Sequence, residues 1–384
     1  MSRRRLTEAA LAGFGITLIL ASLAARQAWW DRHFMPIFAI ARSTLVAAEI
    51  TVRGLICLMG VAVLLVLRRP IAAAVSRATV GDALRIFLAV VLALGCAELL
   101  LRAHPPYPHD ADPLQLEPRR RADPVLGWEF VPARSVVTEE AGRPVSYSFD
   151  NAGHRVSAPA AAVDVEQPTL LFTGESIIAG YGLAWEETIP ARVGALLGIQ
   201  SANLAVSDYS NDQSLLRLSA ELPRFRDPVA VVTLFMPALF DRNLLDNRPR
   251  LSAGFISQPA VRSSRLAALL RWLVPYRSTA AVEQGIMRTR DSLRGLVDLA
   301  HARDAEPLIV VPQFGAETAT DEMLRRRILD EPGLPYVEVK LDPSWHLPGD
   351  MHPDARGAQA IAIAVAERLH RGLTGRISAA AARS

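Results

Sequence analysis

The chain has 384 residues, of which 51% are hydrophobic and 21% charged, and its formal net charge at pH 7 is +3. This small charge, with no stripe of basic residues interleaved with aromatic ones, argues against binding to nucleic acid. The length allows two domains, or one domain with appendages, and the apolar excess is concentrated in the N-terminal quarter.

Three apolar segments predict a membrane region over residues 1–102, with transmembrane helices at about residues 8–27, 48–67 and 84–102. The first segment follows three consecutive arginines, and its short apolar core also fits a cleavable signal peptide. Around the second, residues 36–50 fit an amphipathic helix on the membrane surface as an alternative. In the third, Glu98 precedes Arg102 by one helical turn, a spacing that allows an ion pair at the level of the lipid headgroups.

Arginine-rich loops set the predicted orientation, because such loops stay on the cytoplasmic side. Arg3 to Arg5 and the loop at residues 68–77 are therefore expected in the cytoplasm. The third span then carries the chain outward, so everything after Arg102 is expected on the extracytoplasmic side of a cell (inner or plasma) membrane. Cleavage of the first segment leaves this expectation unchanged, since the later two spans keep their order.

After the membrane region, residues 103–122 are rich in proline and predict a stiff linker. The segment 123–165 contains alternating runs such as Val145 to Phe149, together with turn residues, and predicts a small β-rich prelude. The main domain, prelude included, is expected over residues 123–372, and a flexible tail over residues 373–384.

Downstream of the prelude, continuous apolar runs separated by helical stretches predict a parallel sheet with helices on both faces. The segment 236–262 is long for a connection in a compact domain and contains Arg242, Arg248 and Arg250, so it is either a lid or binding loop, or an ordinary surface excursion. Strands are expected at residues 169–173, 200–204, 229–235, 306–311 and 335–340, and helices at residues 188–197, 211–222, 262–272, 278–303, 319–328 and 355–371.

A serine follows the first of these strands, in Gly174-Glu175-Ser176, at the strand end where open α/β sheets bind ligands. No Gly-Lys-Ser/Thr follows, which excludes a P-loop, and the glycine spacing fits neither the dinucleotide fingerprint nor the nucleophile elbow. Such a serine needs a base, and the best candidate is His352, on a loop before the last helix with Asp350 two residues earlier. An imidazole can take the serine proton and return it, and a carboxylate can fix the imidazole tautomer.

These motifs resemble the blocks of the SGNH (GDSL-type) hydrolases. The first block of that family, Gly-Asp-Ser-x-x-x-Gly-x-Gly, corresponds to residues 174–182, with Glu175 in place of the aspartate. The last block, in which an aspartate precedes His-Pro, corresponds to Asp350, His352 and Pro353. The prelude is similar to segments of membrane-attached members, through Leu126-Gly-Trp128 and Asn151-Ala-Gly-His-Arg155.

The resemblance covers roughly residues 123–371 and implies a fold, a reaction and roles for residues. The fold would be a flavodoxin-like three-layer α/β/α sandwich with a parallel sheet, preceded by the transmembrane helices. The reaction would be ester hydrolysis or acyl transfer through a seryl-enzyme intermediate. Ser176 would be the nucleophile, His352 the base and Asp350 the residue that orients it.

Two blocks depart from the family at the oxyanion hole. The second block supplies a glycine N–H, and this position corresponds to Asp208, whose carboxylate would oppose an oxyanion unless it is turned away. The third block supplies an asparagine, where this chain has Ala238 or Leu239; Asn243 and Asn211 are candidate substitutes. The expected oxyanion donors are therefore Ser176, Asp208 and Asn243.

The leading hypothesis is a membrane-anchored serine esterase that acts outside the cytoplasm on an ester, such as an O-acyl group of a surface glycan or lipid. One alternative is an O-acyltransferase on a cell-envelope polysaccharide. Another is a catalytically degenerate domain that binds a glycan or a partner. No cofactor and no metal are expected, since the other histidines lack ligand spacing.

Overall fold

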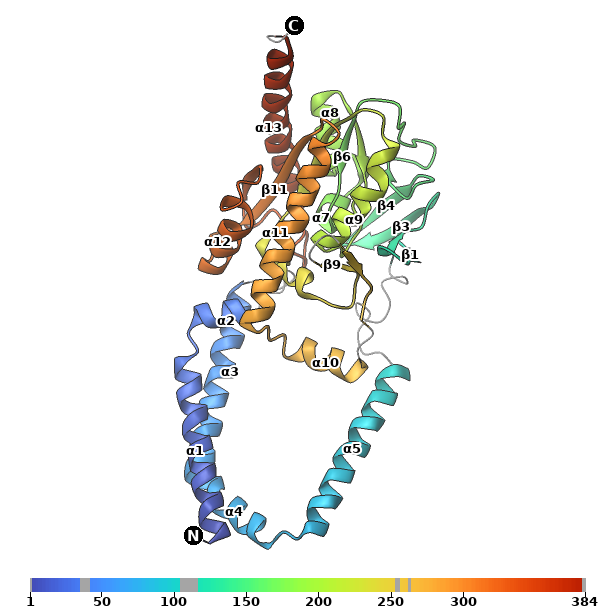
Figure 1. The fold of residues 1–384 in the computed structure, drawn as a ribbon. Helices are drawn as coiled ribbons and strands as arrows, with labels where there is room; N and C mark the ends of the chain where they lie inside the picture. Colours follow the sequence, from blue (N-terminus) through green and yellow to red (C-terminus); the bar gives the residue numbers. More distant parts are fainter. Residues whose placement is uncertain (1, 35–41, 104–116, 253–255, 262–263, 382–384) are drawn as a thin grey trace. The chain divides into compact units, whose positions relative to one another are not determined.

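The computed structural model describes residues 2–34, 42–103, 117–252, 256–261 and 264–381 (Figure 1). By their internal contacts these residues fall into two units. The helical unit contains residues 2–34, 42–103 and 264–277, and the α/β unit contains the others. Most of the predicted linker lies outside the described residues.

The helical unit contains three helical segments that are long and apolar enough to cross a membrane: Arg3–Ala24, Arg42–Arg77 and Val80–Ala103. Residues 42–50, which had an alternative assignment to a surface helix, belong to the second of these segments, while residues 36–41 lie outside the described residues. The helices are α1 (Arg3–Ala24), α2 (Gln27–His33), α3 (Arg42–Ala62) with its π-helical continuation η1 (Val63–Leu67), α4 (Arg68–Arg77), α5 (Val80–Ala103) and α10 (Arg265–Leu273).

Helices α1 and α3 touch through their backbones at Gly15 and Gly60. A Cβ atom built on Gly15 would lie 2.8 Å from the carbonyl oxygen of Gly60, and one on Gly60 would lie 2.7 Å from that of Gly15. Only glycine fits such an approach, which is typical of packed helix pairs in membranes.

The α/β unit is built on an eight-stranded sheet with the strand order β12-β11-β8-β6-β7-β5-β4-β3. Along the chain, the five parallel strands occupy the order 2-1-3-4-5 of flavodoxin-like folds. The order reverses between β6 and β8, so the carboxyl ends of these two strands border the crevice where such sheets bind ligands. The parallel strands are β6 (Thr169–Phe172), β7 (Gln200–Asn203), β8 (Pro228–Leu234), β11 (Glu306–Phe314) and β12 (Tyr336–Leu341).

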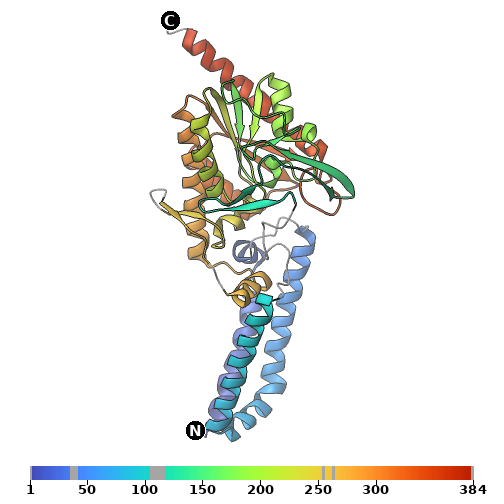
Figure 2. The ribbon, with the colours of Figure 1, turned by 90° about the vertical axis from the view of Figure 1, so that its right-hand side faces the viewer.

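Helices cover both faces of this sheet, so its strands are buried on both sides and read as continuous apolar runs. On one face α8 (Ile189–Leu197) packs against α13 (Ala355–Ala381), and on the other α9 (Asn211–Glu221) packs against α11 (Thr279–His301) (Figure 2). The predicted three-layer α/β/α sandwich is confirmed. Its buried core includes Leu170, Phe172, Ala230, Val232, Leu308 and Val310.

The prelude joins the main sheet instead of preceding it as a separate element. Strands β3 (Ser135–Glu140), β4 (Arg143–Phe149) and β5 (Arg155–Val156) extend the sheet in antiparallel fashion beyond β7, and β1 (Arg120–Asp123) and β2 (Gly127–Phe130) form their own hairpin. The sheet is therefore mixed, where the sequence predicted a parallel one. Short alternating runs identify strands, but they do not identify the edge to which those strands pair.

Several other segments refine the sequence prediction. The long segment after β8 contains the 3₁₀ helix η4 (Pro237–Leu244) and a hairpin of β9 (Arg250–Ser252) and β10 (Ile256–Gln258). The helix expected at residues 319–328 is divided into α12 (Ala319–Arg325) and the π-helical η5 (Arg326–Asp330). Helix α13 continues through Ala381, into the residues expected to form a tail.

Candidate active site

Ser176 lies directly beyond β6, at the first position of the short helix α7 (Ser176–Ala179). The turn that presents it needs Gly174, which has a φ of 154° and would bring an added Cβ atom to 3.1 Å from Ile178 Cγ1. Glu175 caps the helix, because its Oε1 accepts a hydrogen bond from Ile177 N at 3.0 Å. The strand end, the glycine turn and the cap together fix the serine at the crevice.

Arg155, from β5 of the prelude, holds the loop that follows Ser176. Its guanidinium is fully buried and donates to the carbonyl oxygens of Ala179, Gly180 and Leu183 at 2.6, 2.5 and 2.5 Å. It also lies 4.3 Å from the ring centre of Tyr147. Burial lowers the pKa of Arg155 to about 10, which still leaves it charged at neutral pH. The prelude thus fixes the backbone around the serine.

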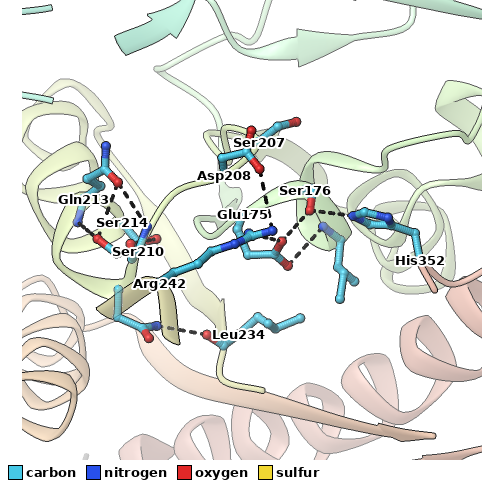
Figure 3. Close-up of polar contacts among 12 residues, drawn as sticks. Glu175, Ser176, Ser207, Asp208, Ser210, Gln213, Ser214, Leu234, Arg242 and His352 are labelled. Atoms are coloured by element: carbon cyan, nitrogen blue, oxygen red, sulfur yellow. Dashed lines mark hydrogen bonds and ion pairs between the residues drawn. The ribbon is translucent and has the colours of Figure 1, made fainter. Parts of the chain in front are cut away.

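His352 reaches Ser176 from the loop between β12 and α13. Its Nε2 lies 2.7 Å from Ser176 Oγ (Figure 3). Its Nδ1 lies 2.6 Å from Asp350 Oδ1. Because the carboxylate can only accept, Nδ1 carries the proton and Nε2 is left to accept from the serine. Burial favours the neutral form of Asp350, but the hydrogen bonds that its carboxylate accepts from the side chain and backbone of His352 outweigh this effect and lower the pKa of Asp350. The structure therefore joins the three predicted residues in one hydrogen-bonded chain.

Glu175 competes with His352 for the serine proton. Its Oε2 lies 2.5 Å from Ser176 Oγ, and a hydroxyl has only one proton to donate. The same carboxylate oxygen accepts a hydrogen bond from Arg242 Nη1 at 3.0 Å. Donation to His352 is the arrangement that prepares the serine for attack, and Arg242 favours it by satisfying Glu175.

Asp208, which the sequence predicts in place of an oxyanion-hole glycine, has a backbone conformation that is typical of glycine. Its φ is 67°, in the left-handed region that non-glycine residues seldom populate. Its carboxylate is bound by Arg120 Nη1 at 2.8 Å and approached by Arg242 Nη2 at 3.6 Å. Burial alone would raise the pKa of Asp208, but Arg242, Arg120 and Arg248 outweigh it and hold the pKa at about 2. The carboxylate is therefore ionised and paired.

These charges largely cancel around the serine. Arg120 and Arg242 contact the carboxylates of Glu175 and Asp208, and Arg248 donates a hydrogen bond to the backbone carbonyl oxygen of Asp208. Arg242, whose side chain is 16% exposed, contacts both carboxylates. Burial alone would lower the pKa of Arg242, but the neighbouring carboxylates outweigh it and raise the pKa, so Arg242 stays charged. The negative charge expected to oppose an oxyanion is thus balanced.

Two backbone N–H groups are available at the crevice. The N–H groups of Ser176 and Asp208 donate to no other described residue. Asn243, the third expected donor, is engaged elsewhere: its Nδ2 donates to Asn211 Oδ1 at 2.8 Å, and its Oδ1 accepts from Asn211 N at 2.9 Å. The Nδ2 of Asn211 donates in turn to Leu234 O at 3.1 Å. Neither asparagine is bonded to Ser176.

The roles of the arginines at this site were not predictable from the sequence. Arg120, Arg155 and Arg242 come from the linker border, the prelude and the long segment after β8. The departure of positions 175 and 208 from the family pattern was the available signal, since two carboxylates near one serine require counter-charges. Among the described residues, no group of histidine, cysteine and carboxylate side chains is arranged to hold a metal ion.

Comparison with known proteins finds resemblance in structure but not in sequence. No family model matches the chain, and no curated protein matches it. A lipolytic protein of the G-D-S-L family from Desulfitobacterium hafniense aligns at 13% identity over 52% of this chain and 98% of its own, with a TM-score of 0.34. An arylesterase from Agrobacterium tumefaciens aligns at 15% identity over 53% of this chain and 99% of its own, with a TM-score of 0.34. An acetyl xylan esterase from Butyrivibrio proteoclasticus aligns at 12% identity over 55% of this chain and 66% of its own, with a TM-score of 0.36.

Proposed function

We propose that this chain is a membrane-anchored serine hydrolase of the SGNH type that cleaves an ester outside the cytoplasm. The observation that carries the proposal is the hydrogen-bonded chain from Ser176 Oγ to His352 Nε2, at 2.7 Å, and from His352 Nδ1 to Asp350 Oδ1, at 2.6 Å. This is the arrangement of nucleophile, base and orienting carboxylate that acyl transfer to a serine requires. The substrate would be an ester such as an O-acyl group on a surface glycan or lipid.

In the proposed reaction, Ser176 Oγ attacks the acyl carbon while its proton passes to His352 Nε2. Asp350 holds the imidazole in place and stabilises the imidazolium that forms. The tetrahedral intermediate then collapses, the C–O bond to the alcohol breaks, and the alcohol oxygen takes the proton from His352. Water then attacks the acyl-enzyme in the same way, with His352 as base, and the carboxylic acid is released.

The proposed oxyanion site uses backbone donors within a balanced set of charges. The N–H groups of Ser176 and Asp208 would donate to the developing oxyanion, as the family's serine and glycine do. Asn243 Nδ2 already donates to Asn211 Oδ1, and Arg242 would add its positive charge to the two backbone donors. Its guanidinium contacts Glu175 Oε2, which itself contacts Ser176 Oγ, so it lies close to where negative charge develops.

The membrane part of the proposal is supported by the three long apolar helices. Residues 1–102 would anchor the protein, and the domain of residues 123–372 would lie on the extracytoplasmic side, as the arginine-rich loops indicate. Residues 103–122 would connect the two.

A second candidate function is binding without catalysis. It is favoured by the contact of Glu175 with Ser176 Oγ, which offers the serine proton an unproductive acceptor. In this alternative, the domain would hold a glycan or a partner in the crevice without cleaving it.

The test uses the full chain in detergent, with an activated short-chain acyl ester and a fluorophosphonate probe. We expect ester turnover and labelling of Ser176, and loss of both in Ser176→Ala. Equal turnover by wild type and Ser176→Ala, with no labelling, would refute the enzyme and leave the binding function. Addition of polysaccharide acceptors separates hydrolysis from O-acyl transfer, because a transferase delivers the acyl group to the acceptor and a hydrolase releases the free acid.

A further inference from the structure

Helix α10 is the part of the helical unit that the three apolar segments do not explain. It lies far along the chain, between β10 and α11 of the α/β unit, yet its contacts are with helices near the N-terminus (Figure 1). Its first turn and the segment that follows its last residue are both fixed within the helical unit.

The N-terminal end of α10 is capped by a carboxylate from α5. Glu98 accepts hydrogen bonds from the backbone N–H groups of Arg265 and Leu266 at 3.0 and 2.8 Å, and from Arg102 Nε at 2.8 Å. Glu98 precedes the end of α5 at Ala103 by five residues, which is about 8 Å along a helix. Since α5 is about 36 Å long and the hydrocarbon core of a bilayer is about 30 Å thick, this end of α10 lies near the hydrocarbon boundary.

The segment that follows α10, which ends at Leu273, is fixed to α2, and α2 begins three residues after α1 ends. Arg277 N donates to His33 O at 2.7 Å, and His33 Nδ1 lies 2.6 Å from Arg277 O. Tyr276 stacks on His33, with ring centres 5.5 Å apart, and lies 6.3 Å from Trp29. Tryptophan and tyrosine gather at the membrane–water boundary, so this end belongs to the same depth as the first.

The sequence of α10 is that of an amphipathic helix. Leu266, Leu269, Leu270 and Leu273 follow the spacing of one helix face, with arginines at positions 265 and 271 off that face. Leu270 and Leu273 are 54% and 57% exposed. On α5, Leu99 and Leu100 near the Glu98 level are 68% and 63% exposed, so the two helices present apolar surface together.

We propose that α10 lies in the plane of the membrane interface, with its leucine face in contact with lipid acyl chains and its arginines near lipid phosphates. A helix that is held at one depth by its first turn and by the segment just after its last residue runs along the boundary, and its composition fits such a position. The α/β unit is thereby attached to the membrane at a second point, through the segment between β10 and α11. This proposal rests on the membrane part of the proposed function and not on its ester chemistry.

The test measures depth in the bilayer. In a variant with Cys57→Ser and Cys96→Ser, single cysteines carrying a fluorophore are placed by Leu270→Cys on α10, Leu92→Cys in the middle of α5, and Met287→Cys on α11. The full chain is reconstituted in phosphatidylcholine and phosphatidylglycerol vesicles containing lipids brominated high or low on the acyl chain. We expect the label at 270 to lose most emission with shallow bromines, the label at 92 with deep ones, and the label at 287 with neither.

The controls separate the two ways of failing. If the label at 270 keeps its emission while the label at 92 is quenched, the interfacial position of α10 is refuted and the spanning helices stand. If neither is quenched, the membrane part of the proposed function fails, and the inference fails with it. Deep quenching at 270 would also refute the inference, because it would place α10 inside the hydrocarbon core.

Discussion

The two sides of Ser176 are built on different principles. On one side, His352 and Asp350 lie two residues apart on a single loop and act through two hydrogen bonds to fixed atoms. On the other side, Glu175 and Asp208 contact arginines from two distant segments of the chain, Arg120 in β1 and Arg242 in η4. The first side is local and directional. The second side joins residues far apart in the chain and depends on the balance of charge. Substitutions on the two sides of Ser176 should therefore impair the protein in different ways.

The largest loss of activity should come from substitution on the side of Ser176 that holds His352 and Asp350. His352→Gln removes the proton acceptor and should lower kcat by roughly 10⁴-fold to 10⁶-fold while leaving thermal stability close to that of wild type. Turnover of the activated ester and a melting curve measure the two quantities. His346→Gln is the matched control, since His346 lies on the same loop and bonds Leu347 O. Comparable losses in both variants would mean that the loop, and not the imidazole at 352, matters.

On the side of Ser176 that holds Glu175 and Asp208, a substitution should cause a smaller loss of activity but should also lower stability. Arg242→Met leaves the carboxylates of Glu175 and Asp208 without their shared partner, beside the developing oxyanion. We expect kcat to fall by about 10²-fold to 10³-fold and the free energy of unfolding to fall by about 3 kcal/mol. Steady-state kinetics and denaturant unfolding provide the measurements.

A rescue variant and a surface control sharpen this prediction. Arg242→Met combined with Asp208→Asn removes one charge of each sign and should recover part of both losses. Arg226→Met is the control, because Arg226 pairs with Glu166 at the surface and should change little. Unaltered kinetics in Arg242→Met, or no recovery in the double variant, would count against the charge-balance account.

The smallest expected effect is a pH dependence of stability that arises from a buried histidine away from Ser176. His154 is buried in the prelude, with Nε2 at 3.2 Å from Glu221 and Nδ1 at 3.3 Å from Asp150. Burial would lower the pKa of His154, but the two carboxylates outweigh it and raise the pKa above the ordinary value. Its contribution to stability is therefore complete below the unfolded pKa of about 6.5 and is lost as pH rises through the folded pKa.

Unfolding measured across pH should show this slope, which is at most about 1.4 kcal/mol per pH unit for one proton. His154→Phe should remove the slope above pH 6.5. The pKa of Asp150 is about 2, so its contribution lies above its unfolded value of about 3.9 and is lost as pH falls toward 2. A slope above neutrality that persists in His154→Phe would assign the proton to another group.

The parts of the fold that could be predicted from the sequence are those that depend on local sequence patterns. The strand Leu170 to Phe172 and the helix Thr279–His301 follow from apolar periodicity, and the order of elements implied the parallel sheet. Edge pairing was not predictable, because β5 meets β7 through a single pair, Arg155 with Asn203, that no sequence period encodes.

The same distinction applies to the site. Ser176, His352 and Asp350 could be predicted as a candidate group because they lie in short motifs at a strand end and on one loop, and the structure joins them by hydrogen bonds. The pairing of Arg120 with Asp208, and of Arg242 with Glu175, joins residues 88 and 67 positions apart. A formal charge at one position indicates that a counter-charge is needed, but only the folded chain determines which residue supplies it.

The left-handed backbone of Asp208 limits the routes by which such a site can evolve. Glycine would adopt a φ of 67° without strain, so the backbone itself accepts the ordinary family residue. Glycine supplies no partner for Arg120 and Arg242, however, and loss of Arg242 first removes the guanidinium that Glu175 and Asp208 share. Each single step is unfavourable, and only paired substitutions are not. We therefore expect single substitutions at positions 208 and 242 to be selected against, so that the aspartate and its arginine partners are retained together.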